Sequence, residues 1–186
     1  MISDGSSAEA RSERFERVAT AVYEPLQRYV RRRAPWDVVD DVVADTLLVL
    51  WRRLDDVIET NELAWCYGVA RRVLANHHRS VGRHRRLLDR ITLASCTAPE
   101  TSVPGDVAPG ALRDAFKRLP AIDREVLALW AWEGLEPRDI ATVLDVSANA
   151  AAIRLHRAKR RLRSQLDGRK NSVVTGQPHV GPRENG

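Results

Sequence analysis

The residues best suited to chemistry in this sequence are the small and basic side chains of residues 147–166, SANAAAIRLHRAKRRLRSQL. A helix that enters the major groove of DNA needs small residues for close approach and a few polar ones to meet base edges. Arginine and lysine further along the helix can then hold phosphates. The stretch therefore predicts a DNA-binding helix, and an ordinary basic surface helix is the alternative.

The two faces of this helix separate packing from recognition. The residues predicted to pack inward recur at steps of four, three and four: Ala151, Leu155, Ala158 and Leu162. The residues predicted to face DNA lie opposite: Asn149, Ala152, Ile153, His156, Arg157 and Arg160. Because Ala152 and Ile153 are apolar, this face is also suited to contact with thymine methyl groups.

The residues that precede this helix predict a helix-turn-helix. Pro137 suits a first helical turn, where its missing N–H costs nothing. Asp145 occupies the turn, where glycine is commoner but aspartate tolerates left-handed geometry. Ser147 is a good N-cap for the second helix. The inward stripe of the first helix is Ile140, Ala141 and Leu144. This spacing matches the DNA-binding motif.

An apolar segment, DVVDDVVADTLLVLWRRL (residues 37–54), predicts a helix of a different kind. Its main stripe is Val39, Val42, Val43, Leu47, Leu50 and Leu54. Leu48, Val49 and Trp51 fall at the edge of this stripe or outside it. A helix that is apolar over so much of its circumference is either central in its domain or covered by a partner. The pattern leaves both interpretations open.

A third helix, predicted from residue 61 or 62 past His84, concentrates the positive charge. Its buried stripe is Cys66, Val69, Ala70 and Val73. Arginines project elsewhere, with Trp65 and Tyr67 beside them, and such rings can stack on unpaired bases. An ordinary solvated basic face is the alternative. Adjacent His77 and His78 point about 100° apart on a helix, so they do not form a metal site by themselves.

Composition limits the remaining possibilities. The 186 residues are 44% hydrophobic but only 5% aromatic, which fits small helical cores, and the net charge is +5. Two cysteines without zinc-ligand spacing predict no metal and no cofactor. Cys66 is predicted to be a small buried apolar residue. Redox sensing by Cys96 is an alternative that the sequence does not exclude. Without a secretory signal or an apolar run of about 20 residues, the sequence predicts a cytoplasmic protein.

The predicted fold is all-α, with two small helical domains joined by a flexible linker. Pro35 is expected to end the first helix and Asp37 to cap the second. The linker is rich in Pro, Gly, Ser and Thr. The expected boundaries are a disordered leader at 1–11, a helical domain at 12–94, a linker at 95–110, a helix-turn-helix domain at 111–167 and a disordered tail at 168–186.

The order DDVVADTLLVLWRRL, AWCYGVARRVLANHHR, a loose linker and the segment LRDAFKRLPAIDREVLALWAWEGLEPRDIATVLDVSANAAAIRLHRAKRRLRSQL resembles one family. It is similar to the extracytoplasmic-function (ECF) sigma factors of bacterial RNA polymerase, which keep only sigma regions 2 and 4. The resemblance covers roughly residues 15–166. It implies a region 2-like helical bundle, a region 4-like helix-turn-helix and a role in promoter-specific initiation.

The resemblance also implies roles for individual residues. Residues implied to bind the β′ clamp helices of core polymerase are Asp41, Asp45, Leu48, Trp51 and Arg52. Residues implied to bind the opened −10 element are Asn61, Trp65, Arg71, Arg72, Asn76, His78, Arg79 and Arg83. The six outward residues of 149–160 named above match positions that face the −35 element. Other implied partners are the β flap, promoter DNA and an anti-sigma factor.

Some positions depart from the family pattern. Relatives often carry Asn in place of Arg72, Asp in place of Asn76 and Val in place of Ala151. The promoter sequence therefore does not transfer from them. The rival hypothesis is a helix-turn-helix transcriptional regulator that acts without being a polymerase subunit. An enzyme, such as a small helical hydrolase or nuclease, is not supported, because no Ser-His-Asp or Cys-His arrangement and no phosphate-binding loop is visible.

Overall fold

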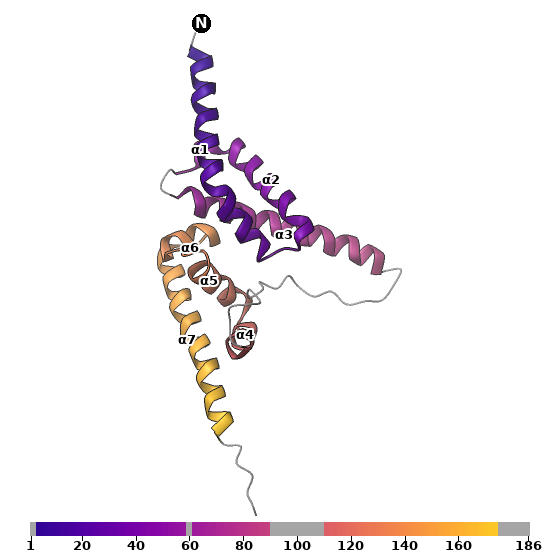
Figure 1. Ribbon diagram of the computed structural model, residues 1–186, viewed down its shortest axis with the longest axis vertical. Helices are drawn as coiled ribbons and strands as arrows, with labels where there is room; N and C mark the ends of the chain where they lie inside the picture. Colours follow the sequence, from indigo (N-terminus) through magenta and orange to yellow (C-terminus); the bar gives the residue numbers. More distant parts are fainter. Residues whose placement is uncertain (1–2, 59–60, 90–109, 175–186) are drawn as a thin grey trace, which may run out of the picture.

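Within residues 3–58, 61–89 and 110–174, which the computed structural model describes, all regular structure is helical (Figure 1). The elements are α1 (Ser3–Arg31), α2 (Trp36–Arg52), a 3₁₀ turn η1 (Leu54–Asp56), α3 (Glu62–Asp89), α4 (Gly110–Lys117), α5 (Ala121–Ala131), α6 (Pro137–Leu144) and α7 (Ala148–Val174). The predicted all-α class is confirmed. None of these helices is long and apolar enough to cross a membrane within the described ranges.

Helices α1, α2 and α3 form the N-terminal half. Their apolar stripes meet in a core that contains most of the predicted stripe of α2, including Val42 and Leu50. Pro35 separates α1 from α2, as expected. The expectation for Asp37 is wrong: Pro35 itself occupies the N-cap position, and Asp37 lies in the first turn of α2. There its negative charge suits the positive end of the helix dipole.

The first helix begins earlier than the sequence predicts. Residues 1–11 were expected to be disordered, yet α1 is helical from Ser3. Arg11 forms an ion pair with Asp55 and donates a hydrogen bond of 2.8 Å to the carbonyl of Trp51. These contacts hold the early turns of α1 against the end of α2. Helix α7 likewise continues to Val174, beyond the expected domain end at 167. The predicted linker lies almost entirely outside the described residues.

The C-terminal half contains the predicted helix-turn-helix. Asp145 ends α6 in the left-handed conformation, with φ at 56°. The Ser147 Oγ accepts a hydrogen bond from the Ala150 backbone N–H at 3.2 Å, which is the N-cap expected for α7. The inward residues Leu144, Ala151 and Leu155 are all buried. The sequence therefore predicted this motif correctly in both its turn and its faces.

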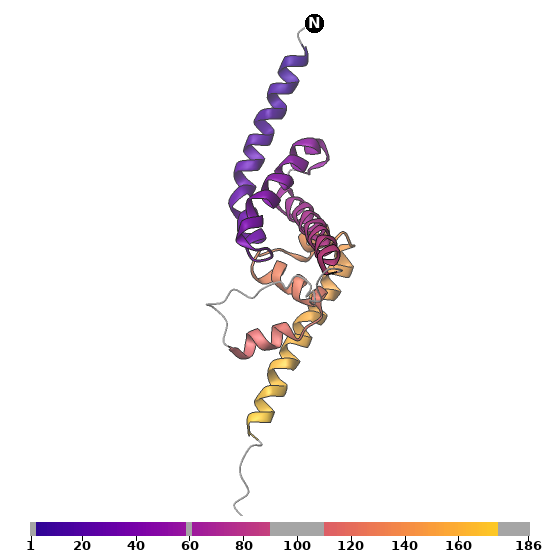
Figure 2. The same cartoon turned by 90° about the vertical axis from the view of Figure 1, so that its right-hand side faces the viewer.

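The two halves pack against each other, which the sequence did not predict. One continuous core joins α1, α2 and α3 to α5, α6 and α7. At Gly68 the α3 backbone approaches α6 so closely that an added Cβ would lie 3.5 Å from both the Thr142 carbonyl oxygen and the Val143 Cα. Figure 2 shows α1 and α7 projecting from opposite ends of the packed region. We call this packing the closed arrangement.

The burial of Cys66 generates a prediction about thiol reactivity. Its side chain has no exposed surface, and burial, together with the nearby charge of Glu62, raises the pKa of its thiol to about 12. At pH 8 only about one thiol in ten thousand would be ionised. In a Cys96→Ser variant we expect labelling of Cys66 by a disulfide reagent to be at least roughly 100-fold slower in the native protein than in denaturant. Equal rates would contradict the burial.

Candidate functional site

The outward face of α7 presents the residues predicted to contact the −35 element. Asn149, His156 and Arg157 are exposed, and Ile153 keeps 43% of its surface accessible. Arg160 is also exposed, whereas Ala152 is half-buried. Steps of three and four residues place these side chains on one face. The face combines one accessible apolar side chain with polar and cationic ones, which is the mixture that direct readout in a major groove uses.

A second candidate surface lies on the outer side of α2. Asp41, Asp45, Leu48 and Arg52 are exposed and follow steps of four, three and four. Leu48 has 46% of its surface accessible. An apolar side chain framed by charges on an exposed helix face is suited to docking on a partner protein. The inward stripe of α2 is buried at the same time, so both interpretations of this helix apply, each to a different face.

Trp51 lies at the edge of that surface and contacts the start of the chain. The Phe15 ring meets it edge-on with centroids 5.1 Å apart. The Arg11 guanidinium lies 5.5 Å from the Trp51 ring centroid. Trp51 still keeps 39% of its surface accessible. The N-terminal turns of α1 therefore extend the candidate docking surface of α2, a contribution that the polar sequence of residues 1–11 gave no reason to expect.

Three residues predicted to bind the −10 element lie beside the C-terminal half. The Asn61 Nδ2 donates a hydrogen bond of 2.8 Å to the Thr142 Oγ1. Arg72 pairs with Asp145 at 3.2 Å. Trp65 lines a groove between α3 and the helix-turn-helix. Trp65 and Arg72 lie on one face of α3 and Asn61 directly precedes that helix, and in the closed arrangement α6 lies against this region.

The remaining predicted −10 residues are divided between two environments. Arg71 and His78 line a cavity between α1, α3 and α5. Asn76 and Arg79 are exposed and joined by a hydrogen bond. The side chain of Arg83 lies outside the described residues. Burial, then the charge of neighbouring His77, lowers the pKa of His78.

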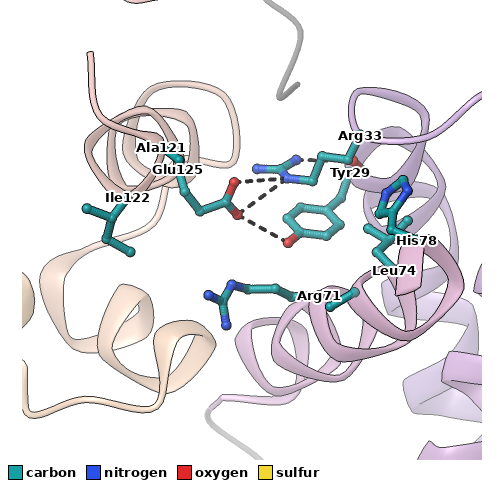
Figure 3. A pocket seen from close by; sticks show the side chains of 9 residues that line it. Tyr29, Arg33, Arg71, Leu74, His78, Ala121, Ile122 and Glu125 are labelled. Atoms are coloured by element: carbon teal, nitrogen blue, oxygen red, sulfur yellow. Dashed lines mark hydrogen bonds and ion pairs between the residues drawn. The ribbon is translucent and has the colours of Figure 1, made fainter. Parts of the chain in front are cut away.

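An interdomain ion-pair cluster, made of Arg32, Arg33, Glu125 and Glu133, joins α1 to α5 and the residues that follow it. The Arg33 Nη1 donates to the Glu133 Oε1 at 3.0 Å, and the Arg32 Nη1 donates to the Glu133 Oε2 at 2.8 Å. The Arg33 Nε lies 3.4 Å from the Glu125 Oε1 (Figure 3). The side chains of Arg33 and Glu133 are only 7% and 2% exposed. This cluster is therefore largely desolvated, and removing one partner would leave a buried charge.

Tyr29 and Tyr67 complete this region. Their rings stack with centroids 4.5 Å apart, and the Arg33 guanidinium lies 3.7 Å from the Tyr29 ring centroid. Burial lowers the pKa of Arg33 by itself, but its electrostatic interactions with Tyr29, Glu125 and Glu133 outweigh burial and raise the pKa above its usual value. Burial, followed by the charge of Glu133, raises the pKa of Tyr67 to about 12. Tyr67 is 2% exposed, so the expectation that its ring stacks on bases does not fit the closed arrangement.

The sequence did not predict the residues of the cluster or the contact of Tyr29 with them. Glu125 and Glu133 are separated from Arg33 by about a hundred positions. Neither glutamate belongs to a motif, and a charged side chain is usually exposed. The sequence contains one weak indication that Glu125 is partly buried: it directly precedes Val126, which lies on the buried side of its helix. This indication does not identify an ion-pair partner, so the contact of Glu125 with Arg33 in the other half could not be predicted.

The fold and these faces define an all-α protein of the helix-turn-helix class. Residues 110–162 match the family model described as "Sigma-70, region 4". The chain is 31% identical to the RNA polymerase sigma-E factor of Streptomyces avermitilis over 161 residues, which cover 83% of this chain and 86% of that protein. The chain therefore belongs to the RNA polymerase sigma factors, in the ECF group. Sigma factors direct the initiation of transcription.

Two solved structures share this fold. The sigma factor RpoE, in complex with the anti-sigma factor NepR from Bartonella quintana, superposes with a TM-score of 0.58 at 24% identity and covers 82% of this chain and 96% of that one. CnrH, in complex with the cytosolic domain of CnrY, gives a TM-score of 0.56 at 26% identity and covers 87% and 94%. These structures confirm the predicted helical architecture, and the sigma-E relative confirms the predicted family.

The two faces of α7 predict opposite phenotypes for neighbouring residues. Arg157 is exposed, so Arg157→Ala should weaken binding to a −35 duplex with little change in unfolding midpoint. Leu155 is 6% exposed, so Leu155→Ala should lower the free energy of unfolding by about 2–5 kcal/mol. Chemical denaturation and DNA titration of both variants check this. Equal unfolding midpoints would mean that the faces are assigned wrongly.

Proposed function

We propose that this sigma factor binds core RNA polymerase through the outer face of α2 and binds promoter DNA through α3 and α7. The exposed face around Leu48 is the observation that carries the polymerase contact, because an accessible apolar helix face framed by charges suits a protein partner. The β′ clamp helices are the partner that the family resemblance implies for this face, and the β flap is implied for the C-terminal half. The protein acts in the cytoplasm, where polymerase and promoters are.

The DNA contacts divide between duplex and opened strands. Helix α7 enters the major groove at the −35 element, with Asn149 and Ile153 near base edges and Arg157 and Arg160 at phosphates. Helix α3 holds the opened −10 element with Trp65 and its arginines, since aromatic rings beside cationic side chains suit unpaired bases. All of this is binding, and no step requires covalent chemistry by the protein. Affinity for promoter DNA falls steeply with salt, because phosphate contacts release counterions.

The closed arrangement and the −10 contact use the same residues. Asn61 and Arg72 are bonded to α6 and to the turn that follows it. The two halves therefore separate before α3 holds DNA. Separation returns the arginines and the glutamates of the interdomain ion-pair cluster to water together. The free-energy cost is therefore much smaller than that of leaving one of these charges buried without its partner. Once apart, the halves remain tethered, and binding of one to its element raises the effective concentration of the other.

An anti-sigma factor is a further proposed partner. The two structural neighbours were solved in complexes, one with the anti-sigma factor NepR and the other with the cytosolic domain of CnrY. In this chain the exposed faces of α2 and α7 offer surfaces that such a protein would mask.

The first test of the proposed function is reconstitution. Purified protein added to core polymerase should form a stable complex and start transcription at specific promoters. Leu48→Ala should weaken core binding by roughly tenfold, as expected for an apolar contact worth about 1–2 kcal/mol, and leave −35 duplex binding unchanged. Ile153→Ala should do the reverse, so each variant controls for the other. A chain that binds operator DNA as a dimer without polymerase would support the rival regulator instead.

A reversible cross-link tests the separation of the halves. Asn61→Cys and Thr142→Cys, with Cys96→Ser and the buried Cys66 retained, place two thiols where a side-chain hydrogen bond now joins α3 to α6. We expect the oxidised protein to bind a promoter with an opened −10 element at least about tenfold more weakly than the same protein after reduction. The Asn61→Cys variant alone is the control. Full promoter binding by the oxidised form would show that the halves need not separate.

A further inference from the structure

A cavity of about 400 Å³ lies where the two halves meet. Its walls come from α1, α3 and α5, so both halves contribute to it (Figure 3). Much of the lining is apolar: Leu74, Ala75, Ala121 and Ile122. The polar groups that face it come from Tyr29, Arg33, Arg71, His78 and Glu125. A concave site with apolar walls and a few convergent polar groups is the usual form of a small-molecule pocket.

Arg33 forms part of the wall of this cavity. Its Nε points to Glu125, and its Nη1 donates to Glu133 and to the Tyr29 carbonyl oxygen. The Nη2 atom is buried and has no hydrogen-bond partner among the described residues. A buried donor without an acceptor is costly, and it is especially so on a charged group. The three bonds that hold the rest of the guanidinium keep Arg33 fixed in the wall of the cavity.

Arg71 supplies a second cation. Its side chain extends from α3 beneath Tyr29 toward the side of Glu125 and Ile122 (Figure 3). No hydrogen bond or ion pair joins Arg71 to another residue in the described part of the chain. Close to the cavity, the guanidinium groups of Arg32, Arg33 and Arg71 face the carboxylates of Glu125 and Glu133. Among these five groups one positive charge is left unbalanced.

We propose that this cavity binds a small organic anion with a single carboxylate or phosphate-ester charge and an apolar body. The anionic group accepts hydrogen bonds from Arg71, the positive charge of Arg33 in the cavity wall adds to the attraction, and the apolar body lies against Leu74 and Ile122. Glu125 repels a second negative charge, which selects against multiply charged ligands. The neutral imidazole of His78 adds no positive charge near pH 7, because its pKa is lowered by burial.

Such a ligand would act on the closed arrangement. Its walls belong to both halves, so the site exists only while the halves are packed together. A ligand that binds one state and not the other stabilises that state in proportion to its concentration and affinity. This consequence rests on the proposed separation of the halves, whereas binding itself does not. A bound anion would therefore keep the face of α3 against α6 and oppose promoter binding.

The experiment uses benzoate as the probe anion and benzamide as its neutral isostere, titrated into the full chain at constant ionic strength. Calorimetry should detect benzoate with a Kd on the order of 1 mM and no comparable binding of benzamide. Arg71→Gln should weaken benzoate binding by about tenfold or more, since it removes a charge-assisted hydrogen bond. Arg79→Gln makes the same change on the exposed part of α3 and should leave benzoate binding within roughly twofold.

Either of two results would overturn the proposal. The first is equal binding of benzoate and benzamide, and the second is equal loss of binding in the two arginine variants. Fluorescence energy transfer between dyes on the two halves, measured with and without benzoate, reports whether the ligand favours the closed arrangement. These measurements need no polymerase or DNA. A negative result therefore removes the ligand site and leaves the proposed function standing, and failed reconstitution of initiation does the opposite.

Discussion

The structure depends on the placement of Arg33 between two carboxylates from the other half of the chain. Its guanidinium lies on the Tyr29 ring and reaches Glu125 and Glu133, and its side chain is 7% exposed. A cation can be buried this far only if charges and hydrogen bonds replace the water it has lost. The cluster thereby ties the end of α1 to α5, and the contact between α3 and α6 belongs to the same continuous core.

In this arrangement the proposed −10 surface of α3 is also a contact surface between the two halves. Asn61 and the face of α3 with Trp65 and Arg72 meet the helix-turn-helix, while the face of α7 proposed to contact DNA stays exposed. Under the proposed function, a chain in this state would meet a −35 duplex with α7 but would not hold an opened −10 strand on α3. A desolvated ion-pair cluster suits such a switch. It specifies one geometry when closed, and both of its partners regain hydration when the halves part.

Local features of the chain were predictable wherever neighbouring residues decide them. Ser147 caps α7, and Asp145 takes the left-handed turn that the motif needs. Cys66 is buried because its position follows the apolar period of α3. The start of α1 was predicted less well, because its early turns depend on Arg11 and Phe15 meeting residues some 35 to 45 positions away. Propensity and periodicity carry no information about such distant contacts.

The sequence by itself therefore determined the helices, the helix-turn-helix, the inward and outward faces and the family. Each of these follows from periodicity or capping within a few turns, or from motif order. Only the tertiary structure decided that the halves pack together, that Tyr67 stacks on Tyr29, and that Arg71 lines a cavity. The physical reason is that burial of a charge or a ring depends on which distant group arrives to replace water. No local pattern of residues predicts which distant group will make that contact.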